Sequence, residues 1–333
     1  MLLFSFFLFT MILVSASMGY VETGIGDVAR ILAHAVSGEK DLVRGMGETL
    51  ITIVMEVRLP RIFTCAAVGG CLAVSGVLFQ GILLNPLADP YTLGVSAGAA
   101  FGACIAILLS LGATVVSVPL FAFAGACATL VFVIFLSHSG KKASTLLSSN
   151  TLILSGIIVG AILSAGISFL KYAADEQVSV IIFWLMGSFA SKTWLDVGLT
   201  VVFLATGFLA AMFFARDLNL ISLGERSATS LGVNTRQVTL ILLVTGSLLA
   251  AISVSVSGII GFVGLLVPHM VRFVTGPDNS RLIPVSMLAG ATLLLCADTV
   301  TRAVLPHEIP IGVLTALIGG PVFCWIFKRG HVH

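Results

Sequence analysis

Long apolar runs, separated by shorter polar stretches, dominate the chain. Most hold about 20 mostly apolar residues, the length that a helix needs to cross a bilayer, and the eighth, residues 259–274, is shorter and rich in glycine. The runs lack the alternating apolar and polar positions of a membrane β-barrel strand. The pattern therefore predicts an all-α, polytopic membrane protein with about ten transmembrane helices in a single domain, residues 1–333. The predicted spans are residues 2–20, 62–84, 91–111, 116–137, 151–172, 194–214, 238–257, 259–274, 282–303 and 310–327.

The first run resembles a signal peptide because Val14-Ser15-Ala16 looks like a small-residue cleavage site. No Lys or Arg precedes the run, whereas a cleavable signal peptide has a positively charged start. We therefore expect residues 2–20 to be retained as the first span.

Two polar connections are long, residues 21–61 and 215–237. The second contains Ser222 with Glu225 three residues later, the spacing of a capping box, and Gly232, a residue type that often ends helices. A bare connection needs only a few residues. We therefore expect a short amphipathic helix of about two turns outside the bilayer, and its polarity suggests a docking surface.

Composition supports the membrane assignment. The chain is 58% hydrophobic and 10% charged, with a mean hydropathy of +1.14, whereas soluble domains carry about 25% charged residues. This composition excludes a soluble enzyme. The net charge of +2 is too small and too scattered for a nucleic-acid partner. The six cysteines lie in apolar runs without a CxxC motif, so we expect small core residues and no metal site.

The distribution of positive charge gives a weak topology signal. Ten spans place both chain ends on one side, and the positive-inside rule favours the cytoplasm only narrowly, because both sides carry similar numbers of Lys and Arg. Basic residues on the outer side, against the usual bias, suggest that some of them have a function on that side. Arg58, Arg61 and Arg302 lie near the outer ends of spans.

Asp298 lies within the ninth span, where charged residues are rare and are candidates for function. Arg302 follows one turn later, so the two side chains share a helix face and are predicted to form an intramembrane ion pair. Two alternatives are an ion-coupling role for Asp298 and an outward-facing role for Arg302. For His269 we expect a structural role at a helix end, with proton transfer or metal binding as the alternative. His331 and His333 form a weak candidate metal pair.

The sequence contains no energy-converting motif. It lacks the G-x-x-x-x-G-K-[ST] phosphate loop, the G-x-S-x-G nucleophile elbow and the H-E-x-x-H metal helix. If the protein drives active transport with ATP, a partner chain must hydrolyse it.

Ordered blocks between residues 58 and 329 carry a family resemblance. They are Arg58-Leu59-Pro60-Arg61, Gln80, Asn85-Pro86-Leu87-Ala88-Asp89-Pro90, Leu93-Gly94-Val95-Ser96-Ala97-Gly98-Ala99, Leu223-Gly224-Glu225 with Ser230-Leu231-Gly232, Gly261-Phe262-Val263-Gly264-Leu265 with Pro268-His269 and Arg272, and Ile309-Pro310-Ile311-Gly312-Val313 with Thr315-Ala316. This series resembles the FecCD/BtuC-like permeases, membrane subunits of type II ATP-binding-cassette (ABC) importers for iron-siderophores, haem and cobalamin. The chain departs from that pattern at its start, where no basic residues precede the first span.

The resemblance implies a permease of the bacterial cytoplasmic membrane that has both termini in the cytoplasm. It also implies a homodimer, or a pseudo-dimer with a paralogue, and two cytoplasmic ATPase subunits that bind ATP and Mg²⁺. A periplasmic or lipid-anchored binding protein would deliver the chelate. This chain itself would hold no cofactor and catalyse no reaction.

The resemblance also assigns roles to individual residues. The coupling helix of the family corresponds to residues 218–232, of which Glu225, Arg226, Ala228 and Leu231 would enter a groove of the ATPase. The full ATPase-coupling set is Leu218, Leu223, Gly224, Glu225, Arg226, Ala228, Leu231 and Gly232. Arg58, Arg61 and Arg302 would receive acidic residues of the binding protein, and Ser148, Ser149 and Asn150 resemble an inner gate.

The sequence therefore predicts import of a metal chelate, with a ferric siderophore first and haem or cobalamin as alternatives. A secondary transporter driven by an ion gradient is a rival reading that calls for more buried carboxylates than Asp298. An intramembrane enzyme calls for a catalytic pair or metal cluster at membrane depth, which the sequence does not show.

Overall fold

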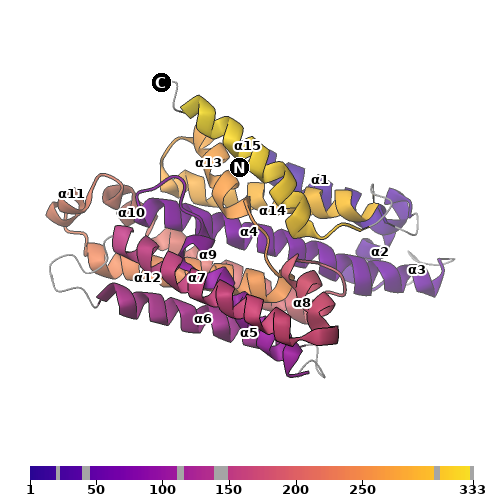
Figure 1. Cartoon of the computed structure of the whole chain (residues 1–333). Coiled ribbons are helices and arrows are strands. Elements are labelled where there is room, and N and C mark those ends of the chain that lie inside the picture. The colour runs from indigo at the N-terminus through magenta and orange to yellow at the C-terminus, as the bar shows by residue number, and fades with distance from the viewer. Residues whose placement is uncertain (20–22, 40–45, 111–115, 139–148, 304–307, 331–333) are drawn as a thin grey trace.

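The computed structural model describes residues 1–19, 23–39, 46–110, 116–138, 149–303 and 308–330. Within these ranges the chain forms helices and no strand, and the long helices lie side by side in one bundle (Figure 1). The α-helices are α1 (Leu2–Ser17), α2 (Ile25–Ser37), α3 (Glu48–Thr52), α4 (Leu59–Ile82), α5 (Val95–Leu108), α6 (Ser117–His138), α7 (Ser149–Ala173), α8 (Val178–Leu185), α9 (Trp194–Phe213), α10 (Ala215–Ile221), α11 (Glu225–Ser230), α12 (Thr235–Ser257), α13 (Val263–Thr275), α14 (Asn279–Ala303) and α15 (Ile311–Gly330). Shorter elements are the π-helix η2 (Ile53–Arg58) and the 3₁₀-helices η3 (Pro90–Leu93) and η5 (Asp175–Gln177).

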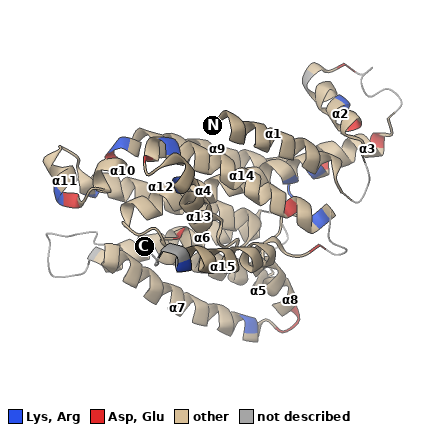
Figure 2. Ribbon diagram, turned by 90° about the horizontal axis from the view of Figure 1, so that it is seen from above, with Lys and Arg blue, Asp and Glu red and all other residues tan. Residues whose placement is uncertain are grey.

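Each of the ten predicted spans coincides largely with one of these helices, so the all-α fold prediction is confirmed. Among the described residues, six helices are long and apolar enough to cross a membrane, and four shorter apolar helices occupy the remaining predicted spans. The four shorter ones are α1, α5, α13 and α15. Charged residues gather mainly toward the two ends of the helices, which leaves an apolar middle zone (Figure 2).

Helix α4 forms the centre of the bundle. In the apolar stretch of the continuous helix 48–82, 94% of the residues are buried, against 22% for α7 and 17% for α9. Close packing is possible because glycines meet backbone to backbone: a Cβ on Gly76 would lie 1.8 Å from the carbonyl oxygen of Gly264 on α13. The outer faces of α7 and α9 are therefore left for lipid or for a second subunit.

The connection 21–61 is more ordered than the sequence predicts. Instead of a long loop, it contains α2, α3 and η2, the last of which continues directly into α4. Pro60 lacks a backbone N–H and crowds the carbonyl of Glu56, so a regular α-helix cannot continue through it. The π-helix η2 accommodates this proline just before Arg61.

The predicted helix in the connection 215–237 is present but begins elsewhere. It is divided into α10 and α11 by Gly224, whose φ of +104° is accessible to glycine and strained for other residues. The expected cap at Ser222 is wrong, because its hydroxyl donates to the carbonyl of Leu218 instead. Gly232 does end α11, with a φ of +88°. We call residues 215–232 the knob.

Candidate functional site

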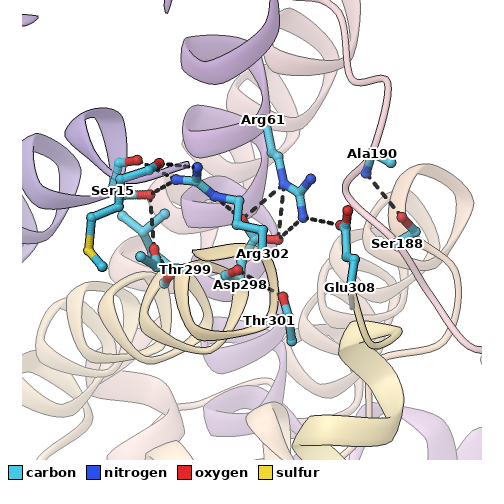
Figure 3. Close-up of polar contacts among 11 residues, drawn as sticks. Ser15, Arg61, Ser188, Ala190, Asp298, Thr299, Thr301, Arg302 and Glu308 are labelled. Atoms are coloured by element: carbon cyan, nitrogen blue, oxygen red, sulfur yellow. Dashed lines mark hydrogen bonds and ion pairs between the residues drawn. The ribbon is translucent and has the colours of Figure 1, made fainter. Parts of the chain in front are cut away.

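A buried ion pair joins α4 to α14 at the end of the bundle farthest from the knob. Arg61 Nε lies 3.1 Å from both carboxylate oxygens of Asp298, and Nη2 lies 2.7 Å from Oδ1 (Figure 3). The Asp298 side chain is 1% exposed and that of Arg61 is 13% exposed. Each charge therefore depends on the other for compensation, in the two-pronged geometry that makes arginine–carboxylate pairs strong.

Two more charged side chains extend this pair. Glu308 Oε1 lies 2.5 Å from Arg61 Nη2, and its side chain is 45% exposed. Arg302 Nε lies 3.5 Å from Asp298 Oδ2, so the structure brings together the two residues that the i,i+4 spacing predicts to pair. We call Arg58, Arg61, Asp298, Arg302 and Glu308 the charge cluster.

Sequence reasoning missed two contacts of this cluster. Arg61 pairs with Asp298 across 237 residues and with Glu308 across 247 residues. No spacing rule reaches such separations. The i,i+4 spacing identifies Arg302 as a partner of Asp298 but does not identify Arg61, whose contact with Asp298 is closer.

Arg58 and Arg302 fasten the last turn of α1. Arg58 Nη1 donates to the carbonyl of Ala16 at 2.7 Å. Arg302 donates to the carbonyl of Met18 at 2.6 Å and to the carbonyl of Ser15. The last carbonyls of a helix have no partner inside it and carry the negative end of its dipole. Two guanidinium groups at this position satisfy those carbonyls.

The expected exposed docking set is therefore corrected for two of its three arginines. Arg58 is 5% exposed and the Arg302 side chain 8% exposed, and both direct their donors into the protein. The physical reason is that the last carbonyls of α1 have no partner within the helix, and these two arginines donate hydrogen bonds to them. Arg61 is partly exposed, as Arg302 is, and lies beside the half-exposed Glu308.

A cavity of about 270 Å³ adjoins the ion pair. Arg61, Asp298 and Glu308 form part of its wall, and residues 187–190 and 309–311 form another part. The backbone N–H of Ile311 donates to the carbonyl of Gly187 at 3.2 Å, which ties the start of α15 to the segment after α8. The charge cluster thus borders a hollow whose wall combines its charged side chains with apolar residues such as Phe183 and Phe189.

The knob presents exposed side chains at the opposite end of the bundle. Leu223 is 68% exposed and Leu231 is 63% exposed, and Glu225 and Arg226 are also exposed. Among the residues that the structure describes, neither Glu225 nor Arg226 forms an ion pair. These four side chains are available to a partner.

Two residues of the expected coupling set have a different place. Leu218 and Ala228 are fully buried, so the expectation that Ala228 enters a partner's groove is wrong. Leu218 lies against Gly81 of α4, where an added Cβ would come within 2.8 Å of Leu218 Cδ1. Both residues hold the knob onto the bundle, because a short helix needs an apolar anchor.

The remaining candidate residues are those of the predicted inner gate and the histidines. Ser149 and Asn150 begin α7, whereas Ser148 lies outside the described residues. The His269 ring meets the ring of Phe273 edge-on at 5.1 Å, and the histidines of the last three residues are outside the described ranges. Among the described residues, no group of three or more His, Cys, Asp or Glu is placed to hold a metal.

Comparison with known proteins gives a family match across nearly the whole chain. The model of the FecCD transport family matches residues 7–329. A Bacillus subtilis protein described as the uncharacterized ABC transporter permease YvrB is 39% identical over 98% of this chain and 92% of its own length. The cobalamin import permease BtuC of Halobacterium salinarum is 41% identical over 86% of this chain and 76% of its own. Other relatives are named for molybdate, haemin and Fe(3+)-citrate import.

A solved structure agrees with the sequence matches. It is described as a metal-chelate-type ABC transporter in an inward-facing conformation, and it is 33% identical with a TM-score of 0.83. The match covers 98% of this chain and 97% of that one. The chain is therefore a multi-pass ABC transporter permease that belongs to the FecCD transport family.

Proposed function

We propose that this chain is the transmembrane subunit of an ABC importer that carries a metal chelate into the cell. A ferric siderophore is the first candidate cargo, with haem or cobalamin as alternatives. The observation that carries the proposal is the exposed knob on a membrane bundle whose sequence lacks a phosphate-binding loop. Two ATPase subunits, which bind ATP and Mg²⁺, would grip the knobs of a permease homodimer.

The placement of charge supports an orientation with the knob and both termini in the cytoplasm of a bacterial inner membrane. Exposed basic residues lie at the knob end, among them Arg216, Arg226 and Arg281. At the other end, Arg58 and Arg302 are occupied inside the protein. These two outer arginines are thus structural, and leaving them out of the count shifts the balance of surface charge toward the knob end, as the positive-inside rule expects of a cytoplasmic side.

Delivery of the chelate by a periplasmic or lipid-anchored binding protein would occur at the charge cluster. Glu308 covers one edge of Arg61 with a half-exposed carboxylate. The ion pair between Glu308 and Arg61 is weakened by solvent because Glu308 is half-exposed. An acidic side chain of the binding protein would therefore compete with Glu308 for the same side of the Arg61 guanidinium group. Arg61 is thus the docking residue of the original three.

Transport in proteoliposomes tests this function. The permease, its ATPase and its binding protein are reconstituted together, and uptake of a radiolabelled ferric siderophore is followed with and without ATP. We expect uptake to require ATP and all three proteins. The Glu225→Ala/Arg226→Ala variant is expected to insert normally and to lose uptake, whereas Arg236→Ala, also exposed but on α12 outside the knob, serves as the matched control.

Two outcomes contradict the proposal in different ways. Uptake that persists in the double variant would remove the docking role of the knob. Uptake that runs on an imposed ion gradient without the ATPase would instead identify a secondary transporter. Screening haem and cobalamin against the purified binding protein then identifies the cargo.

A further inference from the structure

A side-chain amide fastens the knob to the first turn of α14. Asn219 of α10 accepts hydrogen bonds at 2.8 Å through Oδ1 from both the backbone N–H and the side-chain Nδ2 of Asn279. Its own Nδ2 donates to Asp278 Oδ1 at 2.7 Å. The donor and acceptor of one amide are therefore both used to bind a segment 60 residues away in the sequence.

One of these three hydrogen bonds comes from the backbone of Asn279, and the other two involve the side chains of Asn279 and Asp278 at the start of α14. Asn279 is the first residue of α14 and is 3% exposed. Asp278 precedes it, and its Oδ1 also accepts from the backbone N–H of Ser280 at 3.0 Å. Hydrogen bonds from Asn219 and Ser280 lower the pKa of Asp278, so the carboxylate is charged at neutral pH. Displacing Asn219 consequently displaces the start of the helix.

The second attachment of α10 is different in kind. Leu218, the neighbour of Asn219, lies in an apolar contact against Gly81 of α4. Apolar contacts are not directional, so this contact holds α10 against α4 without setting the orientation of α10. Hydrogen bonds weaken steeply when they are misaligned, and the Asn219 amide therefore moves together with α14.

The far end of α14 lies in the charge cluster. The helix has 25 residues, which correspond to about 37 Å at about 1.5 Å per residue, enough to cross a bilayer. Near its last turn Asp298 binds Arg61, and Arg302 binds the end of α1. Helix α14 thus has polar attachments to the knob at one end and to the cluster at the other.

From this geometry we infer that Asn219 is the positioning residue that transmits movement of the knob to α14 and so to the charge cluster. This inference rests on the proposed function, in which an ATPase moves the knob. Through the directional contacts of Asn219, a push on the exposed α11 becomes a shift of α14 along its axis.

The test compares transport with ATP hydrolysis in the reconstituted complex of permease, ATPase and binding protein, with a radiolabelled ferric siderophore as the probe. Asn219→Leu keeps the size of the side chain and removes its hydrogen bonds. We expect ATP hydrolysis to continue while siderophore molecules transported per ATP fall about tenfold, within the usual range of couplings between sites. Gln237→Leu, which removes an exposed amide on α12 outside the knob, is the control and is expected to match the wild type.

A charge swap separates transmission from general damage. Asn219→Asp places a carboxylate against Asp278, and we expect it to uncouple transport as Asn219→Leu does. Adding Asp278→Asn supplies a new amide donor to that carboxylate, which still accepts from Asn279. The double variant Asn219→Asp/Asp278→Asn is therefore expected to recover at least about half of the wild-type transport per ATP, which corresponds to a residual coupling loss within about twofold.

Three results would overturn the inference: unchanged transport per ATP in Asn219→Leu, loss of the ATPase from the purified complex, or failure of the double variant to recover. The second would make Asn219 a support for the docking surface rather than a transmitter. If instead the wild-type complex shows no ATP-dependent uptake, the proposed function itself fails.

Discussion

The two ends of the bundle use the same kinds of charged residue in opposite ways. In the charge cluster, Asp298 is 1% exposed and pairs with Arg61 and Arg302. In the knob, Glu225 and Arg226 are exposed, and within the described ranges neither forms an ion pair. The buried carboxylate of the cluster is paired within the protein, whereas the exposed charges of the knob remain for a partner.

The difference follows from what each end has to satisfy. At the cluster end, the last carbonyls of α1 lack partners within the helix and bind Arg58 and Arg302, and the buried carboxylate of α14 binds Arg61. At the knob end, the short helix α11 follows Gly224 and depends on apolar anchors such as Ala228. We therefore expect substitutions in the cluster to affect stability and substitutions in the knob to affect coupling.

The largest effect on stability is expected for Asp298→Asn. The change leaves Arg61 and Arg302 without their buried counter-charge, and breaking a buried pair costs about 3–5 kcal/mol. The thermal midpoint of the detergent-solubilised protein, read by fluorescence-detected size-exclusion chromatography, is expected to fall sharply. A midpoint equal to that of the wild type would show that the cluster does not hold the bundle together.

A smaller loss is expected for Arg58→Met, which keeps the apolar stem and removes the donors. The carbonyl of Ala16 and the hydroxyl of Thr23 lose a charged hydrogen-bond partner, a change worth about 1.5–3 kcal/mol. The same thermal assay measures it, with Arg216→Met as an exposed control. Equal midpoints for the two variants would mean that α1 needs no guanidinium cap.

Hydropathy was sufficient to predict the fold of the spans. Residues 62–84 and 238–257 read as continuous apolar runs, and they form α4 and α12. The connection 21–61 was not predictable in the same way, because α2 and α3 are short and depend on tertiary contacts. Ile31 of α2 is buried beside Val54 and Leu59. This contact joins segments more than 20 residues apart, so the local sequence pattern does not predict it.

The candidate sites were predictable in type more than in detail. The i,i+4 spacing was enough to place Arg302 beside Asp298, whereas Arg61 and Glu308 come from distant segments. The family resemblance located the knob but gave no exposure, so it grouped the buried Leu218 with the exposed Leu223. Asn219 carried no sequence signal, since its role depends on an adjacent helix start.

A still smaller stability effect is expected for Glu308→Gln. This variant removes the ion pair of Arg61 with the half-exposed Glu308 and keeps its pair with the buried Asp298. Arg61 stays fixed by Asp298 in the variant, and an ion pair with a half-exposed partner contributes about 0–1 kcal/mol. The midpoint is expected to lie close to that of the wild type. A drop as large as that of Asp298→Asn would place Glu308 in the structural core of the cluster.

The smallest effect on stability belongs to the knob variant Leu223→Ser/Leu231→Ser. Both side chains are more than half exposed, and surface substitutions usually change stability within about 0.5 kcal/mol. The variant is nevertheless expected to lose the ATPase during purification of the complex, because burial of two leucines against a partner contributes about 1.5–3 kcal/mol each. Retention of the ATPase at wild-type stoichiometry would contradict this, whereas loss of both the ATPase and the thermal midpoint would show that the leucines pack within the subunit. An unchanged thermal midpoint together with loss of the ATPase would show that the knob serves docking, whereas the cluster serves stability.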